Sequence, residues 1–238
     1  MNPPPRPKLL DLFCSEGGAA VGYHQAGFSV TGIDIDRKPA RRYPYSFILA
    51  DALQYAAEHG HKYDAIHASP PCQGYSRTAG SMKPEQLAKY PKLIPAVREL
   101  LDSLGKPYII ENVVGAPLEE PVLLCGSMFA LEAPDVDGTP LRLERHRLFE
   151  SNRPIAAPSP CVHDRSVQVA GVYGGGSVRR KGKSLTERRG GYTPVKEVRA
   201  RLMGIGHMSQ LGLSEAIPPA YTRWLGTQLL HSMEMSHA

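Results

Sequence analysis

The sequence predicts an α/β fold with a mostly parallel sheet, followed by a small irregular region. Short apolar strands alternate with segments of helical composition over the first 150 of the 238 residues, which is typical of a parallel sheet covered on both faces. Glycines or carboxylates follow the ends of several strands, where open α/β sheets bind ligands. After about Ser151 the alternation stops, and Pro, Gly, Ser and Arg dominate up to Gly191.

The first half of the predicted sheet begins near the N-terminus. Lys8–Phe13 predicts a buried strand, and Cys14–Gly18 predicts the turn that leaves it. Ala19–Ala26 has helical composition and is followed by Gly27, a common residue at helix ends. Ser29–Asp36 then predicts a second strand that ends in carboxylates.

Three further short strands are expected. Ile48–Leu49 leads to Asp51, Ala65–Ala68 is a fully apolar run apart from its histidine, and Tyr108–Ile110 is the next. Apolar residues at helical spacing precede Gly105 and predict a helix between the last two strands. They are Leu93, Ile94, Val97, Leu100, Leu101 and Leu104.

The C-terminal part predicts two more helices, over Val195–Met203 and Pro219–Met233. The second has a plausible buried stripe made of Ala220, Trp224, Leu225, Gln228, Leu229 and Met233. We therefore expect a catalytic and cofactor-binding body over 8–150, a short insert over 151–191, and a segment over 192–233 that packs back on the body.

Composition excludes several classes of protein. There is no run of eighteen apolar residues to span a membrane, and the N-terminus lacks the apolar core of a secretory signal. The four cysteines are scattered, which favours a cytoplasmic protein without disulfides. Cys161 and His163 are possible metal ligands, but the sequence shows no companion pair near them, so no metal is expected.

The net charge of +5 is concentrated in one segment. Arg179, Arg180, Lys181, Lys183, Arg188 and Arg189 face a single acidic residue, Glu187, so this stretch accounts for the whole excess. A solvated loop is the ordinary interpretation of such a segment. Beside a catalytic domain, contact with phosphates is the better hypothesis, because clustered Lys and Arg release counterions from nucleic acid.

The most informative motif is Pro70-Pro71-Cys72-Gln73, directly after an apolar strand. Proline has a fixed φ and no N–H group, so two prolines end the strand abruptly and stiffen the loop. This places a thiol at the carboxyl edge of the sheet, where it is available for nucleophilic chemistry. A small buried cysteine is the commoner alternative, but proline and glutamine are unusual neighbours in a core.

Acidic residues at successive strand ends indicate a nucleoside cofactor. Gly17 and Gly18 follow the first strand, as in turns that bind nucleotides. Asp34 or Asp36 comes about twenty residues later, where a carboxylate accepts hydrogen bonds from a ribose. Asp51 follows the third strand and is suited to an adenine edge, although each aspartate alone is more simply a helix cap.

Two further motifs supply charged groups. Tyr108-Ile109-Ile110 delivers Glu111 to the same edge as Cys72. The alternation in Leu141–Glu150 predicts one strand with Arg145 and Arg147 on the same face, although an edge strand with solvated arginines is the simpler interpretation of this segment alone.

Together these motifs resemble the DNA cytosine-5 methyltransferases. The resemblance runs from Leu9 to Leu230 in the order Asp11-Leu12-Phe13 with Gly17-Gly18, Pro70-Pro71-Cys72-Gln73, Glu111-Asn112-Val113 and Arg145-x-Arg147. Closing segments similar to the family's include Ala216-Ile217-Pro218-Pro219. The resemblance implies a Rossmann-like, S-adenosylmethionine-dependent methyltransferase fold with a short target-recognition region.

It also implies a mechanism and the residues that carry it. Cys72 would add to C6 of a flipped-out cytosine, and Glu111 would contact N3 and the exocyclic amine. Arg145 would help fix the base and the carboxylate, and Arg147 would lie near the same site as a further catalytic residue. The residues implied for S-adenosylmethionine are Phe13, Ser15, Gly17, Gly18, Asp34, Asp51 and Pro70. For DNA contact we expect Gln73, Ser76 and the six basic residues of the insert.

The sequence departs from the family pattern at three places. Ser15 and Glu16 replace a glycine and an apolar residue, and Ser214-Glu215 replaces a Gly-Asn pair, which puts cofactor contacts there in question. The insert is short for reading a DNA sequence, so we expect a short recognition sequence, low specificity or help from a partner protein. The protein itself is expected to be a monomer. Double-stranded DNA in a bacterial or phage-infected cell is the expected substrate; RNA cytosine-5 methylation and a catalytically impaired binding protein are the alternatives.

Overall fold

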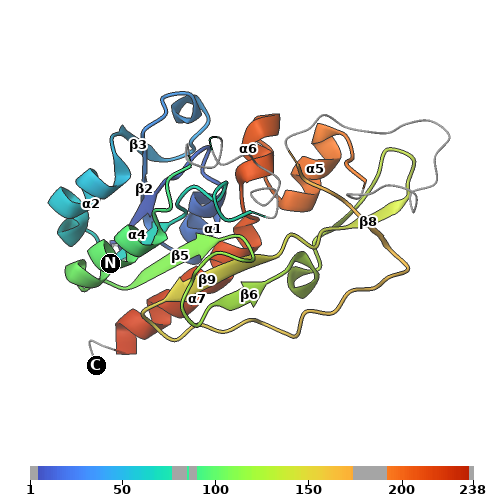
Figure 1. The fold of residues 1–238 in the computed structure, drawn as a ribbon. Helices are drawn as coiled ribbons and strands as arrows, with labels where there is room; N and C mark the ends of the chain where they lie inside the picture. The colour runs from blue at the N-terminus through green and yellow to red at the C-terminus, as the bar shows by residue number, and fades with distance from the viewer. Residues whose placement is uncertain (1–4, 77–84, 86–89, 174–191, 236–238) are drawn as a thin grey trace.

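The computed structural model describes residues 5–76, 85, 90–173 and 192–235, and Figure 1 shows their arrangement. A seven-stranded sheet with the order β3-β2-β1-β4-β5-β9-β6 forms its centre. Its strands are β1 (Lys8–Leu12), β2 (Ser29–Asp34), β3 (Ser46–Leu49), β4 (Ala65–Ala68), β5 (Tyr108–Asn112), β6 (Val122–Leu124) and β9 (Arg147–Ser151). The α/β fold predicted from the alternating pattern is confirmed.

Five strands of this sheet are parallel, and the last two are not parallel to their partners. β3, β2, β1, β4 and β5 pair in parallel, β9 is antiparallel to β5, and β6 is antiparallel to β9. β1 pairs with β2 on one side and with β4 on the other. The strand order therefore reverses at β1, and a crevice at the carboxyl ends of β1 and β4 is the expected ligand site.

Helices cover both faces of the sheet (Figure 1). α1 (Gly18–Ala26) and α7 (Pro219–Met235) pack together on one face, where Tyr221, Leu225 and Leu229 are buried with residues of β1 and α1. α2 (Ala52–His59) and α4 (Ile94–Leu104) cover the other face around Leu10 and Ile66. Single helical turns lie at Pro39–Arg41, Gly60–Lys62 and Gly126–Phe129.

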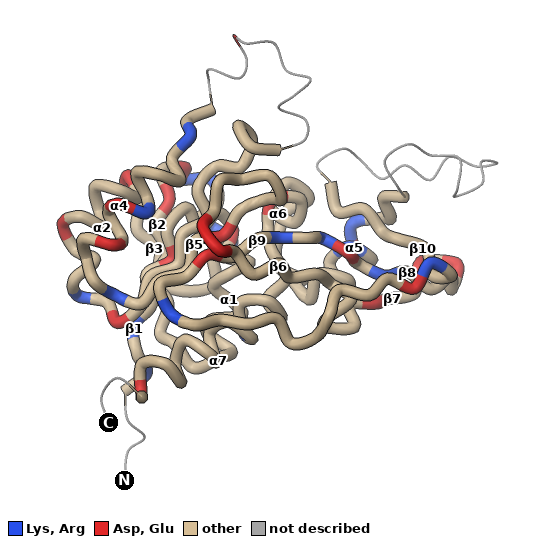
Figure 2. Tube along the Cα trace, turned by 60° about the horizontal axis from the view of Figure 1, so that its bottom comes forward, with Lys and Arg blue, Asp and Glu red and all other residues tan. Residues whose placement is uncertain are grey.

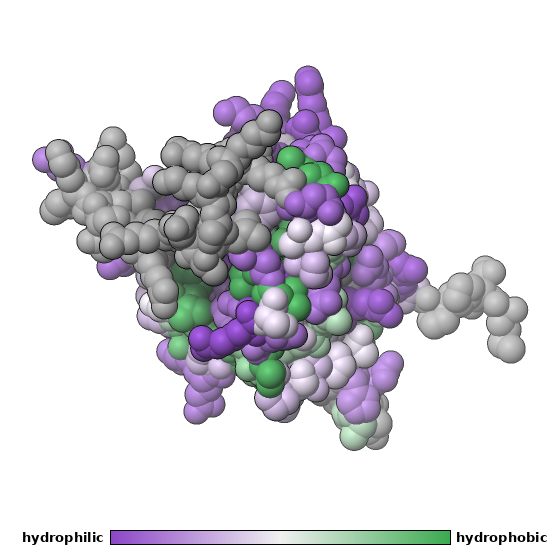
Figure 3. All heavy atoms as spheres, turned by 90° about the vertical axis from the view of Figure 1, so that its right-hand side faces the viewer, coloured by the Kyte–Doolittle hydropathy of each residue, from purple (hydrophilic) through white to green (hydrophobic). Residues whose placement is uncertain are grey.

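A second, smaller layer lies beside the main sheet. β7 (Glu132–Pro134), β8 (Pro140–Arg142) and β10 (Gln168–Val169) form a three-stranded sheet that shares an apolar cluster with α5 (Lys196–Met203) and α6 (Gln210–Glu215). A boundary at residue 150 therefore cuts across this layer, which begins before the insert. On the face seen in Figure 3, apolar side chains form separate patches between polar ones.

The prediction of one strand over Leu141–Glu150 is wrong. The chain leaves β8 after Arg142, joins the main sheet only at Arg147, and has a φ of 31° at Arg145 in between. The reason is tertiary: Leu143 is buried in the cluster of the small layer, whereas Phe149 belongs to the core of the main sheet. Figure 2 shows basic positions along this connection between β8 and β9.

Within the described ranges, no helix combines the length and the apolar character that a membrane span requires.

Candidate active site at the carboxyl edge of the sheet

A cavity of about 270 Å³ opens at the carboxyl edge of the main sheet. It brings together the ends of β1, β2, β4 and β5, and most of the sequence-predicted catalytic and cofactor residues line it. The lining comprises Phe13, Ser15, Asp34, Ile35, Asp36, Pro39, Ser69, Pro70, Pro71, Cys72, Gln73, Glu111, Val113, Arg147 and Glu215.

The turn after β4 presents Cys72 to this cavity. β4 ends at Ala68, and the amide of Asn112 donates a 2.9 Å hydrogen bond to the Pro70 carbonyl, which ties this turn to the end of β5. The carbonyl of Cys72 accepts from the N–H groups of Tyr75 and Ser76, both at 3.0 Å. Burial and then the Glu111 carboxylate raise the pKa of the Cys72 thiol, whereas Arg147 opposes that rise. The thiol is therefore protonated at rest.

Glu111 and Arg147 form an ion pair inside the cavity. Nε of Arg147 lies 3.1 Å from Oε1 of Glu111, and both side chains are largely buried. Burial raises the pKa of Glu111, while Arg147 and a hydrogen bond from Ser69 hold that rise back. Burial thus makes the neutral form of this carboxyl group easier to reach than it is for an exposed glutamate.

A buried chain of hydrogen bonds supports Glu111 from behind. The hydroxyl of Tyr23 lies 3.0 Å from Nδ1 of His67, and Nε2 of His67 lies 2.8 Å from Oγ of Ser69, which bonds to Glu111. Burial lowers the pKa of His67 to about 3, so the ring is neutral and its Nε2–H donates to Ser69 if Tyr23 donates to Nδ1. Sequence reasoning missed this chain, although His67 in an otherwise apolar strand is a signal.

Arg145 does not line the cavity. Its guanidinium donates to the carbonyls of Ala216, Val172 and Ser214 at 2.7, 3.0 and 2.7 Å, and burial lowers its pKa to about 9. The expectation that Arg145 and Arg147 share a face is therefore wrong. Only Arg147 turns toward Glu111, and Arg145 joins the β8–β9 connection to the C-terminal segment.

The first turn is shaped by backbone conformations that few residues adopt. Phe13, Ser15 and Gly17 have φ values of 59°, 46° and 88°. At Gly18 a Cβ atom would lie 2.8 Å from Cβ of Ala216 and 3.0 Å from the carbonyl oxygen of Ile217, so only glycine fits. The C-terminal segment therefore closes directly over this turn.

The predicted cofactor acids differ in their surroundings. Asp34 lines the cavity and accepts hydrogen bonds from the N–H groups of Ser15 and Asp36, both at 2.9 Å. Asp51 accepts from the N–H of Gln54 at 2.9 Å and is the N-cap of α2. The helix-cap alternative therefore describes Asp51 in this structure, and its contact with a cofactor stays a prediction.

Two acidic residues that depart from the family pattern have clear positions. Glu16 is buried, and its Oε2 accepts from the N–H of Ser209 at 2.6 Å, which joins the first turn to the loop before α6. Glu215 lines the cavity beside Asp34 and accepts a hydrogen bond from Ser15. Burial and then the nearby Asp34 raise the pKa of Glu215.

The residues predicted to contact DNA are only partly within the described chain. Gln73 lines the cavity, and among the described residues its buried Oε1 has no hydrogen-bond partner. The hydroxyl of Ser76 donates to the Gln73 carbonyl at 3.3 Å. The six basic residues of the insert, Arg179, Arg180, Lys181, Lys183, Arg188 and Arg189, lie outside the described residues.

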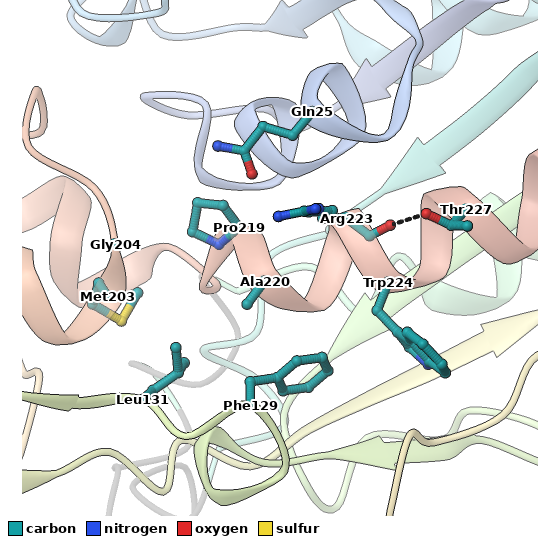
Figure 4. A pocket seen from close by; sticks show the side chains of 10 residues that line it. All are labelled: Gln25, Phe129, Leu131, Met203, Gly204, Pro219, Ala220, Arg223, Trp224 and Thr227. Atoms are coloured by element: carbon teal, nitrogen blue, oxygen red, sulfur yellow. Dashed lines mark hydrogen bonds between the residues drawn. The ribbon is translucent and has the colours of Figure 1, made fainter.

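Another cavity, of about 560 Å³, lies away from this edge, between the start of α7 and the segment around Phe129 (Figure 4). Phe129, Leu131 and Trp224 give it an apolar wall, and Gln25 reaches it from α1. It contains none of the predicted catalytic residues.

The expectation of no metal rested on Cys161 and His163 having no companion pair. That premise is wrong, because the structure places Cys125 and His146 beside them, with all four ligand atoms within 4.8 Å of one another.

Comparison with known proteins agrees with this geometry. The model of the C-5 cytosine-specific DNA methylase family matches residues 7–117, which include Cys72 and Glu111. The match covers a little less than half of the chain, and over that segment the chain is similar to this family. S-adenosylmethionine is the cofactor that the family implies, and the first turn, Asp34 and Glu215 are the residues here that fit it.

Curated methylases match the chain over part of its length. The type II methyltransferase M.AgeI of Thalassovita gelatinovora is 29% identical over 122 residues, which are 45% of this chain and 28% of that protein. M.FnuDI of Fusobacterium nucleatum is 31% identical over 113 residues, 45% of this chain and 33% of that protein. The matched segment thus spans about a third of these relatives' length.

Solved structures share the fold over nearly the whole chain. The Dnmt2 methyltransferase of S. pombe aligns with a TM-score of 0.61 and 14% identity over 95% of this chain and 98% of its own. A putative prophage DNA modification methyltransferase of E. coli aligns with a TM-score of 0.59 and 15% identity, covering 95% and 99%. These likenesses establish the methyltransferase fold.

Proposed function

We propose that this protein transfers a methyl group from S-adenosylmethionine to C5 of a cytosine in DNA. The observation that carries the proposal is that Cys72, Glu111 and Arg147 line the same cavity as Asp34 and Glu215. A candidate nucleophile and an ion-paired acid thus share one continuous cavity with the carboxylates that suit a nucleoside cofactor.

The cofactor side of the cavity suits a purine nucleoside with a positive centre. Ile35 is 74% exposed and lines the cavity, so it offers an apolar surface to a planar base. The Asp34 carboxylate can still accept hydrogen bonds from ribose hydroxyls. Glu215 lies beside it as a second acid, and a bound cation would favour the charged form of Glu215. When bound there, S-adenosylmethionine supplies the methyl group.

The opposite side of the cavity suits a cytosine turned out of the duplex. The Cys72 thiol loses its proton to solvent, and Sγ forms a bond to C6 as the C5–C6 double bond opens. This makes C5 nucleophilic, and Glu111 stabilises the charge that develops on the pyrimidine. After C5 has taken the methyl group, loss of its proton allows the bond between Sγ and C6 to break. A stacked cytosine cannot reach Cys72, so the base must be flipped.

The DNA-binding part of the proposal rests on charge. Gln73 lines the cavity next to the Pro-Pro-Cys turn, and its amide group suits hydrogen bonding to a base edge. We propose that the basic segment over 179–189 holds phosphates as a clamp with little sequence selectivity. Action as a monomer or with a helper protein, in the cytoplasm of a bacterial or phage-infected cell, remains part of the prediction.

Methyl transfer tests the proposal directly. The protein is incubated with S-[methyl-³H]adenosylmethionine and duplex DNA, single-stranded DNA or transfer RNA, beside Cys72→Ser. We expect label in duplex DNA, recovered as 5-methylcytosine, and none with Cys72→Ser. Label found only in RNA would show that RNA, and not DNA, is the substrate. Binding of the cofactor without methyl transfer to any of the three substrates would contradict the proposed activity.

A trapping experiment tests the covalent step separately. Duplex DNA with 5-fluorocytosine blocks the final step, because fluorine cannot leave C5 as the proton does. We expect a protein–DNA adduct that survives denaturation, requires S-adenosylmethionine and maps to the peptide containing Cys72. An adduct on another residue would contradict the assigned nucleophile.

A further inference from the structure

Four soft ligands converge outside the active site. Cys125 follows β6, His146 lies just before β9, and Cys161 and His163 belong to the segment between β9 and β10. Their sulfur and ring-nitrogen atoms all lie within 4.8 Å of one another, although they come from three separate stretches of chain. All four cysteines of the protein are free thiols, so no disulfide accounts for the cluster.

The distances within the cluster fit one tetrahedral ion. Nε2 of His163 lies 3.3 Å from Sγ of Cys125 and 3.1 Å from Sγ of Cys161, and Nε2 of His146 lies 3.3 Å from Sγ of Cys161. Ligands of a tetrahedral Zn²⁺ ion with two sulfurs and two nitrogens lie about 3.4 to 3.8 Å apart, given the usual bond lengths. These three sulfur–nitrogen pairs lie a few tenths of an ångström short of that range, and every other pair lies within 4.8 Å, so small shifts of the four side chains admit the ion.

The surroundings of the ligands are those of a metal site. Nδ1 of His163, the nitrogen that faces away from the sulfurs, lies 3.4 Å from Oε1 of Glu144. Metal-bound histidines usually donate their second N–H to a carboxylate in this way, which holds the ring in place. The hydroxyl of Ser127 donates to Sγ of Cys125 at 3.3 Å, as expected for a sulfur that carries negative charge.

We propose that Cys125, His146, Cys161 and His163 bind a structural Zn²⁺ ion. Four protein ligands close the coordination shell, so no position is left for a substrate or a catalytic water. Soft sulfur with imidazole selects zinc over magnesium or calcium. Cys161 is exposed and His146 half-buried, which leaves the ion a route from solvent.

The position of the cluster indicates that the ion would anchor an irregular segment of the chain. From Asn152 to Val167 the chain has no described helix or strand, and only Ile155 and Ala157 pack against the main core. Such a segment has little apolar area to hold it, and small irregular regions are commonly stapled by a metal. Zn²⁺ would fasten it to the connection that carries His146 and, one residue later, the active-site Arg147.

Metal content tests the site without any measurement of methyl transfer. The full-length protein is purified without chelator from zinc-supplemented cells. It should contain about one zinc ion per chain, measured by inductively coupled plasma mass spectrometry. Cys161→Ser and His163→Ala should lose most of it. Cys72→Ser, a thiol outside the cluster, and His231→Ala, an exposed histidine on α7, should keep it.

Cobalt binding to the natural chain covers the case in which the variants do not fold. After zinc is removed with a chelator, Co²⁺ should produce the intense visible absorption of a four-coordinate site with thiolate ligands, and Zn²⁺ should abolish it. The chelated protein should also expose two more reactive thiols and melt at a lower temperature.

Three results would overturn the proposal. They are zinc far below one per chain together with no cobalt spectrum, zinc retained by both Cys161→Ser and His163→Ala, and a disulfide between Cys125 and Cys161 in the freshly purified protein. The last would assign the cluster to thiol chemistry instead.

Discussion

Nε of Arg147 lies 3.1 Å from Oε1 of Glu111, and this pair joins strand β9 to its antiparallel neighbour β5 inside the cavity. Glu111 would otherwise be a buried carboxylate beside a thiol, which is costly. The ion pair therefore favours the charged form of the acid against the effect of burial and holds its side chain toward β9.

Arg147→Ala should raise the pKa of Glu111 further, because the cation that opposes the effect of burial is lost. We expect a fall in methyl transfer of about a hundredfold and a loss of about 3 kcal/mol in the free energy of unfolding, as when one partner of a buried pair is removed. Carbon-13 NMR of the Glu111 carboxyl group measures the pKa.

Arg147→Lys is the matched control, since it keeps the positive charge but not the planar guanidinium. It should restore most of the pKa and less of the transfer rate. An unchanged Glu111 titration in Arg147→Ala would show that the pair does not govern this acid.

Arg145→Ala should lower the stability of the folded protein, and any fall in methyl transfer should accompany that loss. Three carbonyls, of Val172, Ser214 and Ala216, lose their donors. We expect a loss of about 3 kcal/mol in the free energy of unfolding, near 1 kcal/mol for each bond, measured by urea denaturation. A large fall in kcat with the urea midpoint unchanged would instead support the direct contact with the base that the family resemblance implies.

Gly18→Ala should weaken both stability and cofactor binding. The added methyl group would press on Ala216 and Ile217, which close over the first turn. We expect a cost of about 1 to 3 kcal/mol, typical of overpacking, with a weaker Kd for S-adenosylmethionine by calorimetry. Gly206→Ala, where an added Cβ meets nothing within 4 Å, is the control and should change neither. Equal behaviour of the two variants would refute the close approach.

Asp11 should make the protein less stable as pH rises. It is 1% exposed on β1, burial raises its pKa to about 7 from 3.8, and Tyr43 donates to its Oδ2 at 3.1 Å. Below pH 4 the group is protonated in both the folded and the unfolded chain. Between about pH 4 and pH 7 only the unfolded chain ionises, so the folded state loses up to about 4 kcal/mol.

Asp11→Asn should remove this pH dependence and stabilise the protein at pH 8, because the amide oxygen still accepts from Tyr43. Urea denaturation at pH 5 and pH 8 measures the difference. Asp64→Asn, a change at an exposed aspartate, should leave the wild-type slope in place. A slope that survives in Asp11→Asn would place the titrating group elsewhere.

The sequence predicted those elements whose signals are local. Ala65–Ala68 is a strand with the predicted bounds, and the helix expected before Gly105 spans Ile94–Leu104. Cys72, Glu111 and Asp34 could be assigned to one cavity because the carboxyl ends of parallel strands meet at one edge. The alternating pattern in Leu141–Glu150 wrongly predicted a single strand, because Leu141 and Leu143 are buried in the core of the small layer, whereas Phe149 is buried in the core of the main sheet.

By itself, the sequence determined the fold class and predicted the nucleophile and the acid, because strand periodicity and turn chemistry depend on adjacent residues. Only the tertiary structure decided the roles of residues whose partners are distant in the chain. Arg145 bonds to carbonyls up to 71 positions away, and Cys125 meets His163 across 38 positions. Such contacts depend on how whole elements pack, and no local pattern records that packing.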